Sequence, residues 1–454
     1  MIPAHELTER VLAQSRSDET IVIVTDQHEA SLRWANNSMT TNGVSSSRTW
    51  TVLSIVRDGT TARVGSMTSS SVDPDDIAAV VAASAAAADT AEPASDAMAL
   101  LGDDGAPDGW TDEPGATDVS VFASLTDDLA AGFDSADRLF GFAHHQVDST
   151  WLASSSGLRR RFVLPTGSVE INGKRGADAS AWVGSATKDF TDIAVSALLA
   201  DLSQRLDWSA THFDLPAGRY ETLLPPSTVA DLMLYLVWTM EGRGAEEGHN
   251  ALSRPGGTRL GEKLTDLPLT LFSDPAAPGL EHSPFLATAS SDDSVSVFDN
   301  GLHLGRVDWI RNGVINALSY PRAAAQEFGA EVAVPGENLL LTGGSDATIE
   351  EMVARTERGL LLTTLWYIRE VDPASLLLTG LTRDGVYLIE DGEVRGAVNN
   401  FRFNESPLDL LRRVTEAGAT LPTLPREMKD WFTRTAMPPL RIPDFHMSSV
   451  SKAT

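Results

Sequence analysis

Apolar residues occupy nearly every position between residues 227 and 241, near the middle of the chain. The preceding Pro225–Pro226 pair and the following Gly242 favour the start and the end of a helix. Thr228 and Asp231 have the spacing of a capping box, with Asp in place of the usual Glu or Gln. The run is shorter than the ~20 apolar residues that a membrane-spanning helix needs. A helix that is apolar on all sides is buried, so the pattern predicts an enclosed helix over residues 227–241.

The first half of the chain mixes helical periodicity with runs that are typical of strands. Apolar and β-branched runs on either side of Arg57-Asp58-Gly59 predict a hairpin. An Ala- and Val-rich segment at residues 74–88 is predicted to be helical. Residues 21–24 and 30–35 are predicted to form two neighbouring strands. Hairpin signals favour antiparallel sheets, so the pattern predicts an α+β domain over residues 1–215.

The second half contains many short strand-like runs and few helical ones. A Pro- and Gly-containing segment at residues 214–218 is the best candidate boundary between the halves. Many short strands around one enclosed helix favour a closed or nearly closed β structure. We therefore predict a barrel-like β domain over residues 216–454, with the helix at 227–241 inside it.

Length and charge fit a globular protein with two domains. The chain has 454 residues, of which 42% are hydrophobic and 22% are charged, and a single core rarely serves that length. The 63 acidic and 35 basic residues give a formal net charge of −28. A chain this acidic repels phosphate backbones, so we expect no binding to nucleic acid.

Cysteine is absent from the chain, which excludes disulfides, thiolate metal ligands and a cysteine nucleophile. The first residues, Met1–Glu6, lack the basic and apolar regions of a signal peptide. No apolar run reaches the length that spans a bilayer. The expectation is therefore a cytoplasmic protein that is not attached to a membrane.

The histidines and serines form no recognisable catalytic motif: neither H-E-x-x-H nor G-x-S-x-G occurs. His144 and His145 are adjacent, and on a strand they point to opposite faces, so we expect one inside and one outside. His249 follows Glu246-Glu247-Gly248, a candidate ligand group that is more typical of an acidic loop. The serines at 154–156 are more typical of a turn than of a nucleophile site.

Two segments are candidates for contact with a partner or a peptide. Arg159, Arg160 and Arg161 form the one basic cluster, which is either a solvated strand edge or an interaction edge. The strand-like stretch at residues 399–406 places two aromatic residues among amides and one arginine. These rings either close a core or contact a partner or peptide. The candidate contact residues in this stretch are Asn400, Phe401, Arg402, Phe403 and Asn404.

Several motifs follow one another in a characteristic order in the second half. They are Val297–Leu302 with Ile310–Val314, Asn338–Leu341 with Thr348–Met352 and Arg358–Leu360, Gly385–Glu393 with Asn400–Ser406, and Pro438–Phe445. This order resembles the TldD/TldE (PmbA) modulator-of-gyrase metalloprotease family. The resemblance covers most of the chain and is looser in the first half. It implies an α+β N-terminal domain followed by a barrel-like β domain.

The resemblance also implies where a metal site would lie. TldD-like members carry H-E-x-x-x-H on the central helix and a late cysteine, which together hold a catalytic metal. When Glu241-Gly242 is aligned with the acid–glycine pair of the family, Met233, Leu234 and Trp238 stand at the His, Glu and His positions. None of the three can bind zinc or act as a general base. The chain therefore resembles the TldE-like kind, and we expect no catalytic residue and no metal ligand in it.

The resemblance implies a partner and a role. TldE-like chains form a heterodimer with a TldD-like zinc metalloprotease subunit, and the complex degrades or trims unfolded peptides. We expect zinc in the partner, no cofactor in this chain, and no activity of this chain alone, which leaves a homodimer of the chain alone open. Two alternatives also stay open: an active hydrolase with an unrecognised site around His249 or the serines at 154–156, and a stand-alone peptide-binding module.

Overall fold

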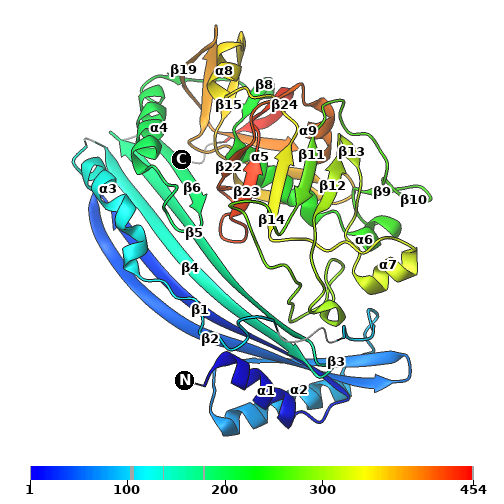
Figure 1. Cartoon of the computed structure of the whole chain (residues 1–454). Coiled ribbons are helices and arrows are strands. Elements are labelled where there is room, and N and C mark those ends of the chain that lie inside the picture. The colour runs from blue at the N-terminus through cyan, green and yellow to red at the C-terminus, as the bar shows by residue number, and fades with distance from the viewer. Residues whose placement is uncertain (1, 103–106, 136, 177–178, 452–454) are drawn as a thin grey trace.

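The structure is a computed structural model that describes residues 2–102, 107–135, 137–176 and 179–451. Figure 1 shows a long curved sheet from the first part of the chain, which faces a more compact second part. The predicted α+β class with antiparallel sheets is confirmed. Among the described helices, none is long and apolar enough to cross a membrane.

The N-terminal sheet consists of antiparallel strands in the order β3-β2-β1-β4-β5-β6. Their bounds are β1 Glu19–Ala35, β2 Ser38–Asp58, β3 Thr61–Ser69, β4 Arg138–Ser154, β5 Arg159–Arg175 and β6 Ala179–Thr187. The predicted hairpin is confirmed, because β2 and β3 pair up to the Asp58–Thr61 turn. Residues 21–24 and 30–35, predicted as two strands, are parts of β1. The polar residues between them do not break this strand, because Asp26 forms a buried ion pair with Arg48 of β2.

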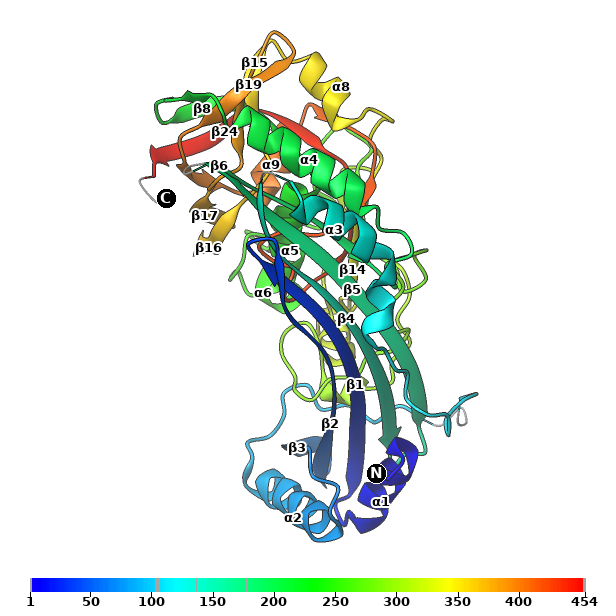
Figure 2. The same ribbon diagram turned by 90° about the vertical axis from the view of Figure 1, so that its left-hand side faces the viewer.

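Helices cover one face of this sheet near its two ends (Figures 1 and 2). Their bounds are α1 Ala4–Gln14, α2 Pro74–Thr90, α3 Thr126–Phe133 and α4 Val195–Trp208, with a 3-10 helix, η1, at Val119–Leu125. The even-numbered apolar residues of β1, from Val22 to Trp34, point to this face and pack against the helices. The other face of the sheet turns toward the second half of the chain.

The second half forms two larger sheets and a short hairpin. One sheet contains β7 His212–Phe213, β8 Gly218–Leu224, β15 Arg358–Leu362, β16 Trp366–Asp372, β17 Leu377–Leu381, β18 Val386–Glu390, β19 Glu393–Val398, β20 Phe401–Glu405, β21 Glu416–Ala417 and β24 Leu440–Val450. The other contains β11 Thr270–Ser273, β12 Val307–Arg311, β13 Val314–Ile315, β14 Asn338–Thr342, β22 Leu421–Thr423 and β23 Arg434–Met437. The hairpin is β9 Ser253–Arg254 with β10 Gly257–Thr258.

The central helix, α5 Pro226–Trp238, lies between these two sheets and contacts strands of both. Shorter helices complete the domain: α6 Gly242–Glu246, α7 Arg322–Phe328, α8 Ile349–Ala354, α9 Pro407–Arg413 and the 3-10 helix η2 Val297–Asp299. In the described part of the chain the strands form separate open sheets, so the predicted barrel does not close. The helix acts as a middle layer that keeps the two sheets apart.

The central helix differs from its prediction at both ends. It ends at Trp238 rather than at residue 241, because Glu241 forms a bridge with Ser319 instead. Trp238 is 42% exposed, so the helix is not enclosed on all sides. The predicted capping box is also wrong, since the Thr228 hydroxyl donates to the carbonyl oxygen of Leu362.

Asp231 is a buried carboxylate in the middle of this apolar helix. Its Oδ1 accepts hydrogen bonds from the backbone N–H groups of Glu427 (3.0 Å) and Met428 (3.1 Å). Burial raises the pKa of Asp231 to about 7, although these hydrogen bonds and the Arg426 charge favour the ionised form. The side chain therefore ties the loop at residues 426–428 to the central helix.

Replacement of this carboxylate should change how stability depends on pH. The folded-state pKa of Asp231 lies above its usual value of 3.8, so its protonation stabilises the fold at acidic pH, and this stabilisation is lost as pH rises toward about 7. Asp231→Asn keeps the Oδ1 acceptor and removes the titration. We expect the variant to gain roughly 1–3 kcal/mol relative to wild type between pH 5 and pH 8. Urea unfolding of both proteins across this range tests it, and parallel profiles would contradict it.

Candidate functional site

A cleft of about 750 Å³ lies between the N-terminal sheet and the second half of the chain. Side chains alternate between the two faces of a strand, and alternate residues of β4 and β5, with Thr25 of β1, line the sheet side of this cleft. The rows that cross these strands are Thr25, Thr150 and Phe162; Gln27, Asp148 and Leu164; Glu29, Gln146 and Thr166; and Ser31, His144 and Ser168. This face is mostly polar, whereas the opposite face is apolar and covered by helices.

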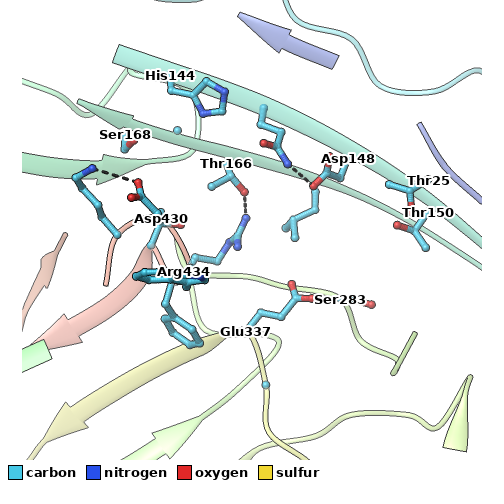
Figure 3. Close-up of a pocket in the computed structure, with 18 of the residues that line it drawn as sticks. Thr25, His144, Asp148, Thr150, Thr166, Ser168, Ser283, Glu337, Asp430 and Arg434 are labelled. Atoms are coloured by element: carbon cyan, nitrogen blue, oxygen red, sulfur yellow. Dashed lines mark hydrogen bonds and ion pairs between the residues drawn. The ribbon is translucent and has the colours of Figure 1, made fainter. Parts of the chain in front are cut away.

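The opposite wall of the cleft comes from loops and strand ends of the second half (Figure 3). Residues 283–287 and 336–337 form one part of this wall, and residues 429–434 form the other. Trp431 is 72% exposed within the second part. Lys429 lies 3.3 Å from Glu170 of β5 and so links the two walls.

Arg434, Asp148 and Glu337 are charged residues that line the same cleft. Arg434 donates hydrogen bonds to the hydroxyl of Thr166 and the carbonyl oxygen of Pro165. Burial lowers its pKa, while the charges of Glu337 and Asp148 oppose this shift. Burial also raises the pKa values of Glu337 and Asp148, and the Arg434 charge lowers both. The side chain of Glu337 is exposed to the solvent in the cleft, although the surrounding protein still desolvates its carboxylate. The charge of Arg434 therefore favours the ionised form of both carboxylates, and their charges favour the ionised form of Arg434.

The two adjacent histidines lie on opposite faces of β4, as the sequence predicts. His145 is buried on the helix-covered face, where its ring nitrogens contact Thr117 Oγ1 (2.7 Å) and the carbonyl oxygen of Lys188 (2.9 Å). Desolvation lowers the pKa of His145 and favours the neutral ring. His144 lines the cleft opposite Ser168. No hydrogen bond is found between these two described side chains, so they do not form a nucleophile–base pair.

The three arginines at residues 159–161 lie where β5 has no partner strand on one side, since β6 pairs only from Gly167 onward. Arg159 forms a bidentate ion pair with Glu9. Arg161 donates to the carbonyl oxygen of Glu113 and lies over the Trp151 ring. Arg160 donates to the carbonyl oxygen of Arg159. These side chains make contacts within the chain along an open edge, and their contact with a partner stays a prediction.

The stretch at residues 399–406 forms an inner strand, β20, between β17 and β24. Phe401 and Phe403 are fully buried in the core, so neither ring offers a surface to a partner. Arg402 is exposed, and Asn404 is half-buried and contacts Thr379. Asn400 accepts a hydrogen bond from the backbone of Asp384. The interpretation of the rings as core closure fits this geometry, and a contact role for the polar residues stays a prediction.

The residues named for an unrecognised hydrolase site have structural contacts instead. His249 is exposed, with Glu247 3.4 Å away. Ser154 and Ser156 hydroxyls lie 2.6 Å apart, and Ser156 donates to a backbone carbonyl oxygen. Ser155 accepts from the N–H of Thr20. These serines hold a turn, as the sequence favours.

Comparison with protein families finds a match in each half of the chain. The PmbA/TldA metallopeptidase C-terminal domain matches residues 217–449, and the PmbA/TldA metallopeptidase domain 1 matches residues 22–88. The chain belongs to the PmbA/TldA metallopeptidase family. No curated protein matches the chain at a significant level.

Solved structures of similar fold agree with this family. TldE from Thermococcus kodakarensis is 16% identical, with a TM-score of 0.76 over 97% of this chain and 98% of that one. A protein from Bacteroides thetaiotaomicron, described as a candidate modulator of DNA gyrase, is 15% identical, with a TM-score of 0.75 over 98% of each chain. A protein from Thermotoga maritima with the same description is 17% identical, with a TM-score of 0.73 over 97% of this chain and 99% of that one. At these identities the likeness concerns the fold.

The family name implies a metal, and the central helix of this member does not fit one. Met233 and Leu234 are each 1% exposed and belong to the apolar core. Trp238 lies at the helix end, where its ring packs edge-on against Tyr235. Across the described ranges, no group of three or more His, Cys, Asp or Glu side chains could hold a metal ion. Met233, Leu234 and Trp238 therefore provide no side chain that can coordinate zinc.

The cleft was missed by sequence reasoning. Burial alternates along residues 142–150 of β4, and most of the less buried positions are polar, namely His144, Gln146, Asp148 and Thr150. That alternation indicates a strand with one wet face, but it does not reveal what lies opposite. Arg434 and Glu337 come from distant parts of the sequence, and no local pattern connects them to Asp148.

Removal of the cleft cation should destabilise the protein in a pH-dependent way. Arg434→Gln leaves Asp148 and Glu337 without their cation, so their raised pKa values should rise further. The fold should then lose more stability at pH 8 than at pH 5, by about 1 kcal/mol, because solvent screens the exposed Glu337. Adding Glu337→Gln should recover part of this loss.

Arg395→Gln serves as the matched control, because among the described residues the ion pairs of Arg395 are with exposed Asp391 and Glu393. Its effect should stay below about 0.5 kcal/mol at both pH values. Chemical denaturation measures all three variants. An equal loss for Arg434→Gln at pH 5 and pH 8 would show that the carboxylates do not depend on this arginine.

Proposed function

We propose that this chain is the non-catalytic subunit of a cytoplasmic TldD/TldE-type metallopeptidase and pairs with a TldD-like chain that holds the zinc. The observation that carries the proposal is the central helix. Met233 and Leu234 fill the core at the aligned motif positions, and Trp238 ends the helix without a ligand atom. An apolar core side chain can neither coordinate zinc nor accept a proton.

The cleft supports a role in the path of an unfolded peptide. Its strand face presents hydroxyl, amide and carboxylate groups in rows, and these groups can pair with the backbone of an extended chain whatever its side chains are. The exposed Trp431 ring adds an apolar contact at the opposite wall. We propose that the cleft guides peptide segments toward the zinc of the partner.

A stand-alone peptide-binding module is the second candidate, and the same cleft favours it. A stand-alone module would bind peptide without a partner, whereas the non-catalytic subunit acts only in the complex. An active hydrolase has less support, because the serines at 154–156 hold a turn and His249 lies exposed beside Glu247.

Native mass spectrometry with metal analysis separates these functions. We expect this chain alone to carry no stoichiometric zinc, and co-expression with the TldD-like chain of the same genome to give a mixed complex with zinc in the partner only. Zinc bound to this chain at one per molecule would contradict the proposal. Peptide binding by the chain alone, with no complex, would favour the stand-alone module.

A reconstructed motif tests whether the helix is now purely a core element. The combined substitutions Met233→His, Leu234→Glu and Trp238→His should destabilise the protein by roughly 3–5 kcal/mol, because polar groups are buried without partners. We expect zinc not to restore the melting temperature. Recovery of stability with zinc would show that the surroundings are still shaped for metal. Trp238→His alone is the control and should cost less, because Trp238 is 42% exposed.

A further inference from the structure

One strand of the N-terminal sheet has a long open edge. Strand β2 pairs with β1 along its length, but β3 pairs only with its second part, from Trp50 to Asp58. Residues 41–49 therefore have β1 on one side and no described strand on the other. Their pairing with β1 is regular, with the register shift lying before Thr41. Figure 1 shows this strand at the outer rim of the sheet, away from the second half of the chain.

This stretch is exposed on both faces as well as at its edge. Every residue from Ser38 to Ser47 is exposed, although neighbouring positions of a strand point to opposite faces. A strand that belongs to a sheet normally buries at least one face against a core. Val44 is 60% exposed, which is unusual for a β-branched apolar side chain in a strand. The described part of the chain supplies no cover for residues 41–47.

Two other open edges, those of β5 and β16, carry features that hinder strand addition. The free edge of β5 has three arginines and Pro165. The edge strand β16 has two register shifts and exposed charged residues. Helix α2 packs against β3, and α4 packs against β6. Charges, prolines, bulges and covering helices are the usual means of protecting a sheet edge.

Residues 41–47 of β2 have none of these features. The sequence from residue 34 to residue 47 contains no charged residue and no proline, in a chain with 63 acidic residues. Gly43 lies in the middle of the segment. A β-carbon on Gly43 would meet no atom of this chain within 4 Å, so internal packing does not require glycine there. Glycine within a strand often marks a close approach of another backbone.

We propose that Thr41–Thr49 of β2, the β2 edge segment, adds a strand of the TldD-like partner and continues the sheet across the subunit interface. This inference rests on the proposed function. A strand of a folded partner fits better than a free peptide, because the partner's own sheet and its covering elements can bury both bare faces. A free peptide would pair with the edge and leave both faces in water.

The charge distribution fits the same occupant. This chain has a formal net charge of −28, so most of its surface presents carboxylates that a partner would have to desolvate. The β2 edge segment contains no carboxylate. Backbone hydrogen bonds along the edge supply affinity without charged contacts. Since the fold is shared across the family at low sequence identity, a partner of this family would present an equivalent sheet.

Hydrogen exchange on the full-length chain, free and in complex with the TldD-like chain of the same genome, tests the proposal first. We expect amides within residues 41–49 to exchange more slowly in the complex. Amides of β3, which already has β2 on one side and α2 packed against it, should change little. A complex in which residues 41–49 exchange at the free rate would overturn the inference and leave the proposed function standing.

A pair of proline variants tests the backbone contact itself. Val44→Pro and Ser45→Pro remove neighbouring N–H groups, which point in opposite directions along a strand, so one faces β1 and the other faces the open edge. The variant whose melting temperature stays at the wild-type value identifies the outward N–H. This variant should bind the partner roughly tenfold or more weakly. Wild-type affinity in both variants would overturn the inference.

The remaining outcomes are also decisive. Protection of residues 41–49 in a homodimer of this chain, or by an unstructured peptide alone, would assign the edge to another occupant and overturn the inference. Failure of the zinc-loaded TldD-like chain to bind at all would overturn the proposed function and the inference together. Titration calorimetry with both purified chains measures these affinities.

Discussion

The packing of α5 between two sheets is the constraint on which the rest of the second half depends. The helix contributes apolar side chains to the largest core of the protein, which also includes residues of both sheets. A buried helix face must be filled at close to crystalline density, so Met233 and Leu234 stabilise the fold at positions where a metal site would need polar groups. The same helix holds the loop at residues 426–428 through Asp231. That loop leads directly into residues 429–434, which form one wall of the cleft.

The N-terminal sheet is organised by its two unlike faces. Its apolar face takes its cover from α1, α2, α3 and α4, and its polar face turns toward the second half of the chain. A polar sheet face cannot fuse with an apolar core without losing its hydrogen bonds to water. Along the cleft the two halves are therefore linked by polar contacts, such as Lys429 with Glu170 and Arg434 with Thr166. Elsewhere the halves share an apolar cluster, in which Leu53 and Leu152 pack with Phe298.

The edges of the sheets divide the surface into protected and unprotected parts. Arginines and a proline protect the open part of β5, and bulges protect β16. Along β2 the chain has neither charge nor proline over residues 34–47. An unprotected edge can pair with a strand of another chain, so the local sequence of β2 is what motivates the proposed interface.

Local sequence was enough to specify the elements whose signals lie within a few residues. The apolar run at 227–241 predicted a helix, which is buried except near its C-terminal end. Arg57-Asp58-Gly59 predicted a hairpin, and His144 and His145, as neighbours on a strand, face opposite sides of it. Because the chain has no cysteine and Met233 and Leu234 carry no ligand atoms suited to zinc, the aligned motif positions cannot hold the metal of the family. The order of the motifs in the second half indicated the family.

Long-range packing decided how far the strands run, whether the second half closes, and which surfaces face one another. Residues 21–24 and 30–35 join into one strand because Arg48 of the next strand neutralises Asp26. The expected barrel stays open because α5 lies between its sheets as a layer. The cleft joins Asp148, Glu337 and Arg434, which are far apart in sequence. A sequence pattern shows which face of an element is polar, but only the tertiary arrangement decides what that face meets, because contacts between distant segments leave no periodicity in either one.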